Sequence, residues 1–211
     1  MIPFDLRPNP PGFRYDDAKH QYFVGDRRIS GITEALQSVG LAPDLSNVPP
    51  RVLAKAQARG TAAHLLTQLL DEGDLGEYDL EHDGYKQAYE KFKADFLFVP
   101  EVIERAICHG VYFFAGRPDR GGTVYSHKIR AVVEIKTTDG IEDWVEFQVA
   151  LQQLLLEHIG FGPIGLRMAV SLRPDGTYST RTFKNPQARQ IALGAVAISN
   201  WKLLTYGGNK K

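Results

Sequence analysis

Sulfur ligands are scarce in this sequence, since Cys108 is the only cysteine among 211 residues. One cysteine cannot form a disulfide within the chain, and by itself it cannot supply a thiolate zinc site or hold an iron–sulfur cluster. The composition therefore fits a reducing compartment, and we expect a cytoplasmic location. Cys108 itself is expected to be a small buried apolar side chain.

Long apolar runs and an excess of charge are also missing. No stretch approaches the roughly 20 apolar residues of a membrane-spanning helix, and the opening MIPFDLRPNPPG has neither the basic nor the apolar part of a signal peptide. We therefore expect neither secretion nor membrane insertion. Lys plus Arg equals Asp plus Glu at 25 each, so a polyanionic partner has to meet a local basic patch.

Three common catalytic signatures are absent as well. The sequence contains no GxxxxGK[ST] phosphate loop, no GxSxG nucleophile elbow and no HExxH zinc helix. Nucleotide-driven motor activity is thus not encoded in these residues.

The first half of the chain predicts short strands followed by two helices. Residues 13–36 alternate aromatic and polar side chains and run into a helix near Thr33. Pro49 and Pro50 open a long helix that carries His64 near its middle, and a second amphipathic helix begins at Tyr85.

The second half predicts a sheet, a helix, a hairpin and a final helix. Three or four strands are expected within 102–140, with turns at His109-Gly110, at Gly121-Gly122 and near Lys128. A helix over 142–159, a hairpin of strands 166–172 and 178–183, and a last helix from Asn185-Pro186 to Gly207-Gly208 follow. The order is that of a mixed α/β fold, and we expect one domain over residues 1–211. Within it, residues 1–48 would form a β-meander or lid appended to a core at 49–211.

The stretch AVVEIKTT, residues 131–138, places charge in an otherwise apolar strand. Because strand side chains alternate between faces, Val132, Glu134 and Lys136 share one face. Charges on so apolar a strand are costly to bury and are usually paired with each other, with solvent or with a metal.

Asp119 is the expected third member of this charged group. It closes the strand-like run YFFAGRPD and is joined to Glu134 and Lys136 through a Gly-Gly turn and one strand, so neighbouring strands can bring the three together. Two carboxylates suit a hard divalent cation, and the lysine remains to steer or activate a water. By spacing alone, a structural ion-paired network explains the trio equally well.

The order of the surrounding motifs is more specific. RGTAAH, an acidic residue at Glu104, AGRPD, VVEIKT and QVALQ follow one another in one chain. This succession resembles the RecB-like branch of the PD-(D/E)XK nuclease superfamily, from HQYFVGDRRISGITEAL to DGTY. The resemblance implies a restriction-endonuclease-like core, with a mixed central β-sheet flanked by helices. The single cysteine disfavours the members that carry an iron–sulfur cluster.

The resemblance also implies a site for two Mg²⁺ or Mn²⁺ ions. Its ligands would be the side chains of His64, Glu104, Asp119 and Glu134 and the carbonyl of Ile135. Glu101 is the alternative to Glu104, which could otherwise lie on a solvated strand face, and His64 could instead be an ordinary core or surface histidine.

The catalytic residues implied by the resemblance are Asp119, Glu134, Lys136 and Gln148. Lys136 would orient the attacking water and offset charge on the phosphate, and Gln148 would face the scissile phosphate. The family usually places Tyr four residues later, where this chain has Gln152.

Contacts to DNA are predicted for Arg59, Arg117, Arg120 and Gln152, although the three arginines could be ordinary surface charges. The predicted function is a divalent-metal-dependent deoxyribonuclease, an exonuclease of recombination, repair or phage DNA processing that hydrolyses phosphodiesters with a metal-activated water. The alternative is a non-catalytic DNA-binding or assembly module that keeps the fold. DNA is the expected partner, with a homo-oligomer or a recombination or replication protein left open.

Overall fold

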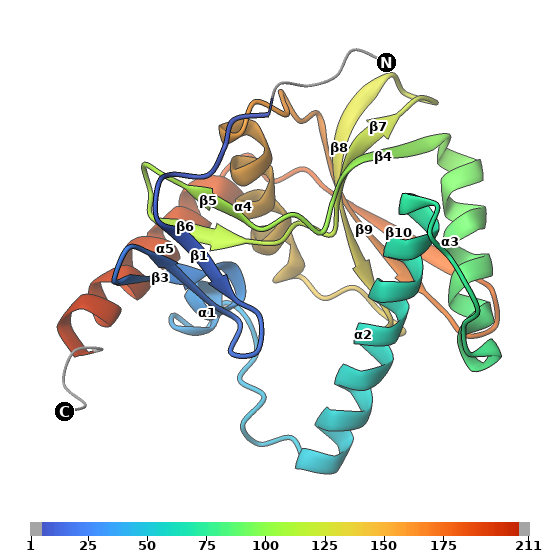
Figure 1. Cartoon of the computed structure of the whole chain (residues 1–211), viewed down its shortest axis with the longest axis horizontal. Helices are drawn as coiled ribbons and strands as arrows, with labels where there is room; N and C mark the ends of the chain where they lie inside the picture. The colour runs from blue at the N-terminus through green and yellow to red at the C-terminus, as the bar shows by residue number, and fades with distance from the viewer. Residues whose placement is uncertain (1–5, 207–211) are drawn as a thin grey trace.

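The computed structural model describes residues 6–206 and consists of two mixed β-sheets with helices packed around them (Figure 1). The elements in chain order are β1 (Phe13–Asp16), β2 (Gln21–Val24), β3 (Arg27–Gly31), α1 (Ile32–Gln37), α2 (Pro50–Glu72), a 3-10 turn η1 (Leu80–His82), α3 (Asp83–Phe96), β4 (Phe98–Ile103), β5 (Ile107–His109), β6 (Phe114–Gly116), β7 (Arg120–Val124), β8 (Ile129–Lys136), α4 (Val145–His158), β9 (Leu166–Leu172), β10 (Tyr178–Phe183) and α5 (Ala188–Tyr206).

The first sheet joins the beginning of the chain to a later segment, in the order β1-β2-β3-β6-β5. β1, β2 and β3 are antiparallel neighbours, whereas β3 pairs in parallel with β6, so that Ser30 lies opposite Phe114. Ile29 and Phe114 are fully buried. The N-terminal strands are therefore hydrogen-bonded to residues some 80 positions further along the chain.

The second sheet has the order β10-β9-β8-β7-β4, with β8 at its centre. β8 pairs antiparallel with β7 and in parallel with β9. Ala131, Val133 and Ile135 belong to the apolar cluster shared with α3, while Val132 belongs to the cluster shared with α4. Because side chains alternate along β8, Glu134 projects to the same side as Val132, toward α4.

Helices cover both faces of the second sheet. α3 packs against α2, β4, β9 and β10, whereas α4 packs against β8 and β9, and α5 packs against α4 and α1. Figure 1 shows the N-terminal half of α2 extending below the rest of the molecule. None of the helices in residues 6–206 is long and apolar enough to cross a membrane.

The mixed α/β prediction is confirmed, including α2, the hairpin of β9 and β10, and the alternation along β8. Sheets between helices are consistent with the restriction-endonuclease-like core that the resemblance implies. The predicted turn at Gly121-Gly122 is wrong, because both glycines lie inside β7. Asp119 does not close a strand but immediately precedes β7, and α4 begins at Val145, later than predicted. Gly207-Gly208, the expected end of the last helix, lies outside the described residues.

Candidate metal centre

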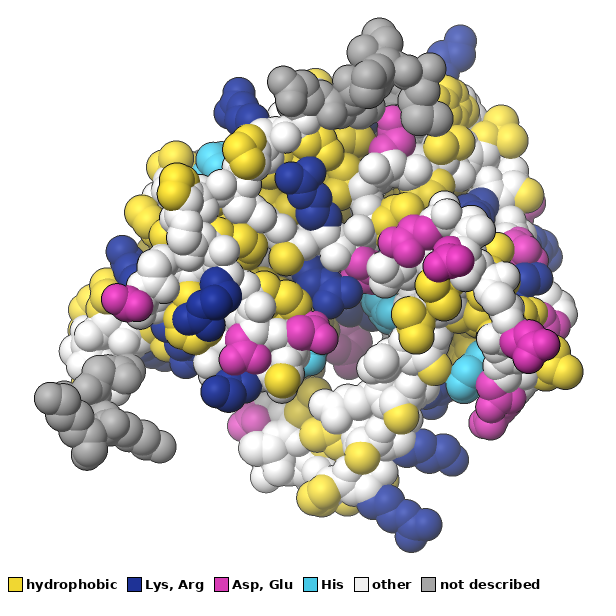
Figure 2. Space-filling model, viewed as in Figure 1, with side chains coloured by type: hydrophobic (Ala, Val, Ile, Leu, Met, Phe, Trp, Pro, Cys, Tyr) yellow, Lys and Arg dark blue, Asp and Glu magenta, His cyan; other side chains and the backbone are white. Residues whose placement is uncertain are grey.

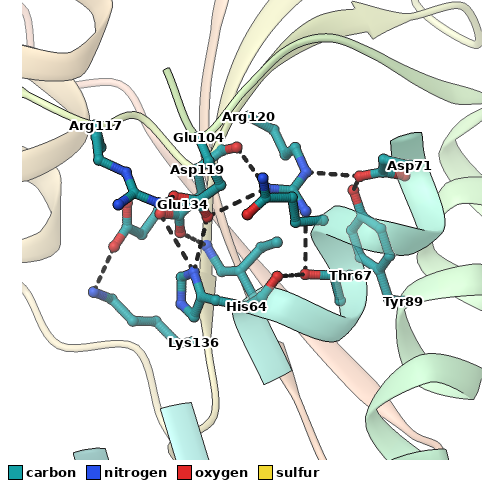
Figure 3. Close-up of polar contacts among 12 residues, drawn as sticks. His64, Thr67, Asp71, Tyr89, Glu104, Arg117, Asp119, Arg120, Glu134 and Lys136 are labelled. Carbon is teal, nitrogen blue, oxygen red and sulfur yellow. Dashed lines mark hydrogen bonds and ion pairs between the residues drawn. The ribbon is translucent and has the colours of Figure 1, made fainter. Parts of the chain in front are cut away.

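Three separate segments bring His64, Glu104 and Asp119 together (Figure 3). His64 comes from the middle of α2, Glu104 directly follows β4, and Asp119 directly precedes β7. His64 Nδ1 lies 3.2 Å from Glu104 Oε1 and 3.6 Å from Asp119 Oδ1. The candidate ligand atoms of all three lie within 4.8 Å of one another. One imidazole and two carboxylates at this separation can bind a single divalent cation.

The backbone fixes the two carboxylates. Glu104 has a φ of 43°, in the left-handed region that non-glycine residues rarely adopt, and its N–H donates to the Asp119 carbonyl at 3.2 Å. Asp119 Oδ2 accepts the Ile135 N–H at 2.6 Å. Such a conformation persists only where surrounding contacts hold it, and it is concentrated at functional sites. Both carboxylates are therefore placed by main-chain geometry as well as by side-chain packing.

Glu134 lies beside this cluster but is turned toward α4. Its Oε1 accepts Lys136 Nζ and Gln148 Nε2, each at 2.7 Å, and its Oε2 accepts Gln152 Nε2 at 2.5 Å. Lys136 Nζ also donates to Gln148 Oε1 at 3.1 Å. Because three donors surround the Glu134 carboxylate, it does not join the His64, Glu104 and Asp119 group in this conformation.

Arg120 lies inside the protein, behind the cluster. Its side chain is 0% exposed, so the predicted contact between Arg120 and DNA is not supported by this geometry. Its Nη1 donates to Glu104 Oε1 at 3.4 Å and to the Asp119 carbonyl at 2.6 Å, and its Nη2 donates to Thr67 Oγ1 at 3.1 Å. Its Nε donates to Asp71 Oδ2 at 2.6 Å. Arg120 thus holds both carboxylate-bearing segments from the inside.

Asp71 balances the charge of Arg120. The Asp71 carboxylate is 0% exposed and also accepts Tyr89 OH at 2.6 Å and Lys93 Nζ at 2.7 Å. We call Arg120, Asp71, Tyr89, Lys93 and Thr67 the supporting network. It connects α2, α3 and β7 to the candidate metal ligands (Figure 3).

Arg117 lies on the solvent side of the cluster and is about one third exposed. Its Nη2 pairs with Glu104 Oε2 at 3.1 Å, and its Nη1 pairs with Asp17 at 3.2 Å. Arg117 Nε is buried without a hydrogen-bond partner among the described residues. Arg117 therefore connects the turn between β1 and β2 to a candidate metal ligand.

The pKa values in the cluster follow from burial and crowding of carboxylates. Burial and the neighbouring Glu134 raise the pKa of Asp119 to about 8. Burial lowers the pKa of His64, but Asp119 and Glu104 raise it more, to about 9. Burial opposes ionisation of Glu134, yet Lys136 and its hydrogen bond lower the pKa of that carboxylate overall.

These residues fit a divalent cation. A raised Asp119 pKa means that the basic side chains present do not fully offset the buried carboxylates, and a hard cation would relieve that deficit. The donor set of carboxylate oxygens and one imidazole suits Mg²⁺, Mn²⁺ or a similar ion. The buried Gln152 Oε1, beside Glu134, has no hydrogen-bond partner in residues 6–206 and is a further oxygen donor.

A cleft of about 970 Å³ opens onto the cluster. Its walls come from the β1–β2 segment, from α1, from α2 and from α4, and His64, Glu104, Arg117, Gln148 and Gln152 reach its surface. Figure 2 shows acidic, basic and histidine side chains gathered in this hollow near the centre of the view. The cleft gives a ligand access to His64 and Glu104, two of the three candidate metal ligands.

The structure brings together most of the predicted site residues. His64, Glu104 and Asp119 form the cluster, while Glu134, Lys136, Gln148 and Gln152 form the adjoining group. Glu101, the alternative to Glu104, instead accepts the Thr123 hydroxyl on β7 at 2.7 Å. Arg59 lies apart from the cluster, where its Nε contacts Thr137 Oγ1 at 3.5 Å.

The sequence analysis does not predict the supporting network. It singles out one member, Arg120, but as a contact to DNA. Thr67 and Asp71 lie three and seven residues after His64, a spacing that places them on the same side of a helix. That spacing was a usable signal for Asp71. Tyr89 and Lys93 gave no signal of this kind, because only the packing of α3 against α2 brings them to Asp71.

Comparisons with known proteins give distant likenesses. No protein-family model matches the sequence. No curated protein matches it either. Among solved structures, the chain is similar to the alkaline exonuclease LHK-Exo from Laribacter hongkongensis, with 12% identity over 86% of this chain and 92% of that one and a TM-score of 0.47. LHK-Exo in complex with dAMP gives 14% identity, coverages of 83% and 88%, and a TM-score of 0.43. A protein called SSO0001 gives 19% identity, coverages of 82% and 75%, and a TM-score of 0.41.

Proposed function

We propose that this protein is a divalent-metal-dependent deoxyribonuclease. The observation that carries the proposal is the gathering of His64, Glu104 and Asp119 within 4.8 Å. His64 and Glu104 line the cleft, and the ion pair of Glu134 with Lys136 lies beside this cluster. Two Mg²⁺ or Mn²⁺ ions are proposed, with Glu134 and the Ile135 carbonyl completing the second site after Glu134 turns from α4.

The chain itself would perform three tasks. His64, Glu104 and Asp119 hold the cation, which when bound supplies Lewis acidity and a nucleophile at neutral pH. Lys136, one fifth exposed and hydrogen-bonded to Glu134, orients a water and offsets negative charge on the phosphate. Gln148, which accepts a hydrogen bond from Lys136 Nζ at 3.1 Å, keeps Lys136 in position beside the phosphate after Glu134 has turned from α4.

Cleavage of end-labelled DNA in Mn²⁺ tests the proposal. Wild type is expected to cleave, and Lys136→Ala is expected to lose cleavage by roughly 10²-fold or more while retaining Mn²⁺ binding in calorimetry. Lys91→Ala, which removes an exposed lysine on α3, is the matched control. Absence of cleavage by wild type, or equal cleavage by wild type and Lys136→Ala, would reject the mechanism.

We further propose that cleavage is exonucleolytic and serves recombination, repair or phage DNA processing. Incubation with linear and with covalently closed circular DNA of the same sequence tests this part. An exonuclease degrades only the linear form, so ready degradation of closed circles would refute it.

A second candidate is a non-catalytic DNA-binding or assembly module. It is favoured by the ion pairs that engage these carboxylates, namely Lys136 with Glu134 and both Arg117 and Arg120 with Glu104. This candidate predicts DNA binding without Mn²⁺ binding. Calorimetric titration of wild type with Mn²⁺ therefore separates the two functions.

A further inference from the structure

The N-terminal half of α2 carries a row of cations, formed by Arg51, Lys55 and Arg59, which we call the α2 basic row. Successive members are four residues apart, so each step rises about 6 Å along the helix and turns by about 40°. Figure 2 shows basic side chains projecting at the lower end of the molecule, where Figure 1 places this part of α2. The row lines a shallow groove of about 480 Å³ together with Val52 and Ala56.

No carboxylate in residues 6–206 forms an ion pair with the row. The sequence has no Asp or Glu between Asp44 and Asp71. Arg51 and Lys55 are exposed, and within residues 6–206 neither side chain forms a hydrogen bond or an ion pair. An acidic residue three or four positions from a cation on the same helix would stabilise that helix, and α2 offers none to this row. The α2 basic row is therefore free to meet an external anion.

The row is also placed where it weakens the helix. The N-terminus of a helix carries a partial positive charge, which favours acidic residues and disfavours basic ones. α2 has no acidic residue in its first turn and no side-chain cap at Pro49. Like charges four residues apart repel each other as well. Arg51 lies in the first turn of α2, and like charges follow it at Lys55 and Arg59, so the row does not stabilise the helix.

Gly60 adds an independent observation at the inner end of the row. It lies inside α2 and lines the cleft, and a Cβ there would meet only Thr137 Oγ1, at 4.0 Å. Glycine is unfavourable inside a helix, and neither a positive φ nor crowding within residues 6–206 requires it. Glycine also allows a ligand to approach the backbone closely.

The row and the cleft meet at this point. Gln57, Thr61 and His64 line the cleft on one side of α2, while Arg51 and Lys55 lie on the opposite side. Arg59 directly precedes Gly60, and its Nε contacts Thr137, the residue after Lys136. The inner end of the row is thus adjacent to the strand that carries Glu134 and Lys136.

We propose that the α2 basic row binds the phosphate backbone of a nucleic-acid strand outside the cleft, and that Gly60 lets the strand approach α2 where it leaves the cleft. This inference rests on the proposed function and deepens it, because it assigns the contacts that a substrate longer than the cleft makes. The ligand class is a polyanionic strand, which three cations in a row and no acid can recognise without base contacts.

Arg51→Gln/Lys55→Gln tests the row. The control is Lys91→Gln/Lys184→Gln, which removes one exposed lysine from α3 and one that follows β10. Binding of a labelled single strand of roughly 16 nucleotides is measured in EDTA, which prevents cleavage, over a range of salt concentrations. Loss of two phosphate contacts makes the plot of log binding constant against log salt concentration less steep, by about 1.4 in slope. The same loss raises the Kd about 25-fold at 0.1 M salt. The control pair is expected to change neither quantity.

Three further readouts make the test specific. A dinucleotide, which stays inside the cleft, is expected to bind wild type and Arg51→Gln/Lys55→Gln equally. The Tm of this variant is expected to equal or exceed that of wild type, because repulsion is removed. Gly60→Ala is expected to raise the Tm as well and to weaken binding of the longer strand.

The outcomes separate the two proposals. If wild type neither binds DNA nor cleaves it, the proposed function fails. If wild type binds DNA and Arg51→Gln/Lys55→Gln behaves as the control pair does, the basic row has no role and this inference is overturned. A changed Mn²⁺ affinity in Arg51→Gln/Lys55→Gln would also overturn it, since the row lies apart from the metal ligands.

Discussion

Asp71→Asn should damage both the fold and the metal site. The Asp71 carboxylate is fully buried and accepts hydrogen bonds from Arg120, Tyr89 and Lys93 at 2.6 to 2.7 Å. The substitution keeps the shape of the side chain but removes the nearer counter-charge of the fully buried Arg120 guanidinium, which is then paired only with Glu104, at 3.4 Å. Removing one partner from a buried ion pair costs about 3–5 kcal/mol.

Urea unfolding measures the loss of stability. For a chain of this length, a loss of about 4 kcal/mol corresponds to a fall in Tm of roughly 10 °C. Asp74→Asn is the matched control, because Asp74 is exposed just after the end of α2 and should change the free energy of unfolding by less than about 0.5 kcal/mol.

The metal site should be affected through Arg120. With Asp71 neutral, Arg120 is held less firmly, and so are Glu104 and the Asp119 carbonyl that it contacts. Residues that orient metal ligands typically contribute 10- to 100-fold to affinity, and we expect a Mn²⁺ Kd raised within about that range. The Mn²⁺ affinity is measured well below the Tm of the variant, where it is folded. If Asp71→Asn then binds Mn²⁺ as tightly as wild type, the supporting network stabilises the fold but does not affect metal binding. If Asp71→Asn is as stable as Asp74→Asn, the stabilising ion pair between Asp71 and Arg120 is refuted.

Two other predictions concern the fold. Burial and the stacked His158 ring, 4.1 Å away, lower the pKa of His109 to about 4, and neutral Nδ1 accepts the N–H groups of Val111 and Tyr112. Since the unfolded chain takes up this proton near pH 6.5, stability should fall as pH drops from 6.5 toward 4, by about 2 kcal/mol between pH 7.5 and 5. Urea unfolding of His109→Phe at pH 7.5 and at pH 5 should show a decrease in the free energy of unfolding that is about 2 kcal/mol smaller than in wild type. An equal decrease in both proteins would disprove the role of His109. Gly122→Ala should lower the Tm by several degrees, because its Cβ would lie 2.4 Å from the Val99 carbonyl; a Tm equal to wild type in differential scanning calorimetry would show that β4 can shift.

Local patterns predicted the elements well where one signal dominated. Pro50 at the start of α2, and the strands on either side of the turn in RPDGT, follow from turn and capping chemistry that acts over a few residues. Gly121-Gly122 was misread for a physical reason. A glycine pair usually marks a turn, but here both glycines lie in β7 and serve packing. A Cβ at Gly122 would lie 2.4 Å from the Val99 carbonyl, and one at Gly121 would lie 3.0 Å from the Leu156 side chain.

The sequence predicted those site residues that belong to short motifs, and it did not predict the residues outside them. The cluster of His64, Glu104 and Asp119 follows from motif order, whereas the orientation of Glu134 toward α4 depends on how that helix packs. Arg120 shows the limit most clearly. Its position next to Asp119 indicated a surface role, but alternation along β7 turns it into the interior, where Asp71 lies 49 residues earlier in sequence.

The hydrogen bond from the Ile135 amide to Asp119 has a consequence for ion selectivity. The Ile135 amide occupies one lone pair of Asp119 Oδ2, so a cation that bound both oxygens of Asp119 would compete with this hydrogen bond, whereas Oδ1 carries no main-chain hydrogen bond. Large ions such as Ca²⁺ commonly rely on carboxylates that bind through both oxygens, whereas Mg²⁺ favours six single-oxygen ligands in a tight octahedron. This amide hydrogen bond therefore favours single-oxygen binding by Asp119, and with it a small cation, at the candidate metal centre.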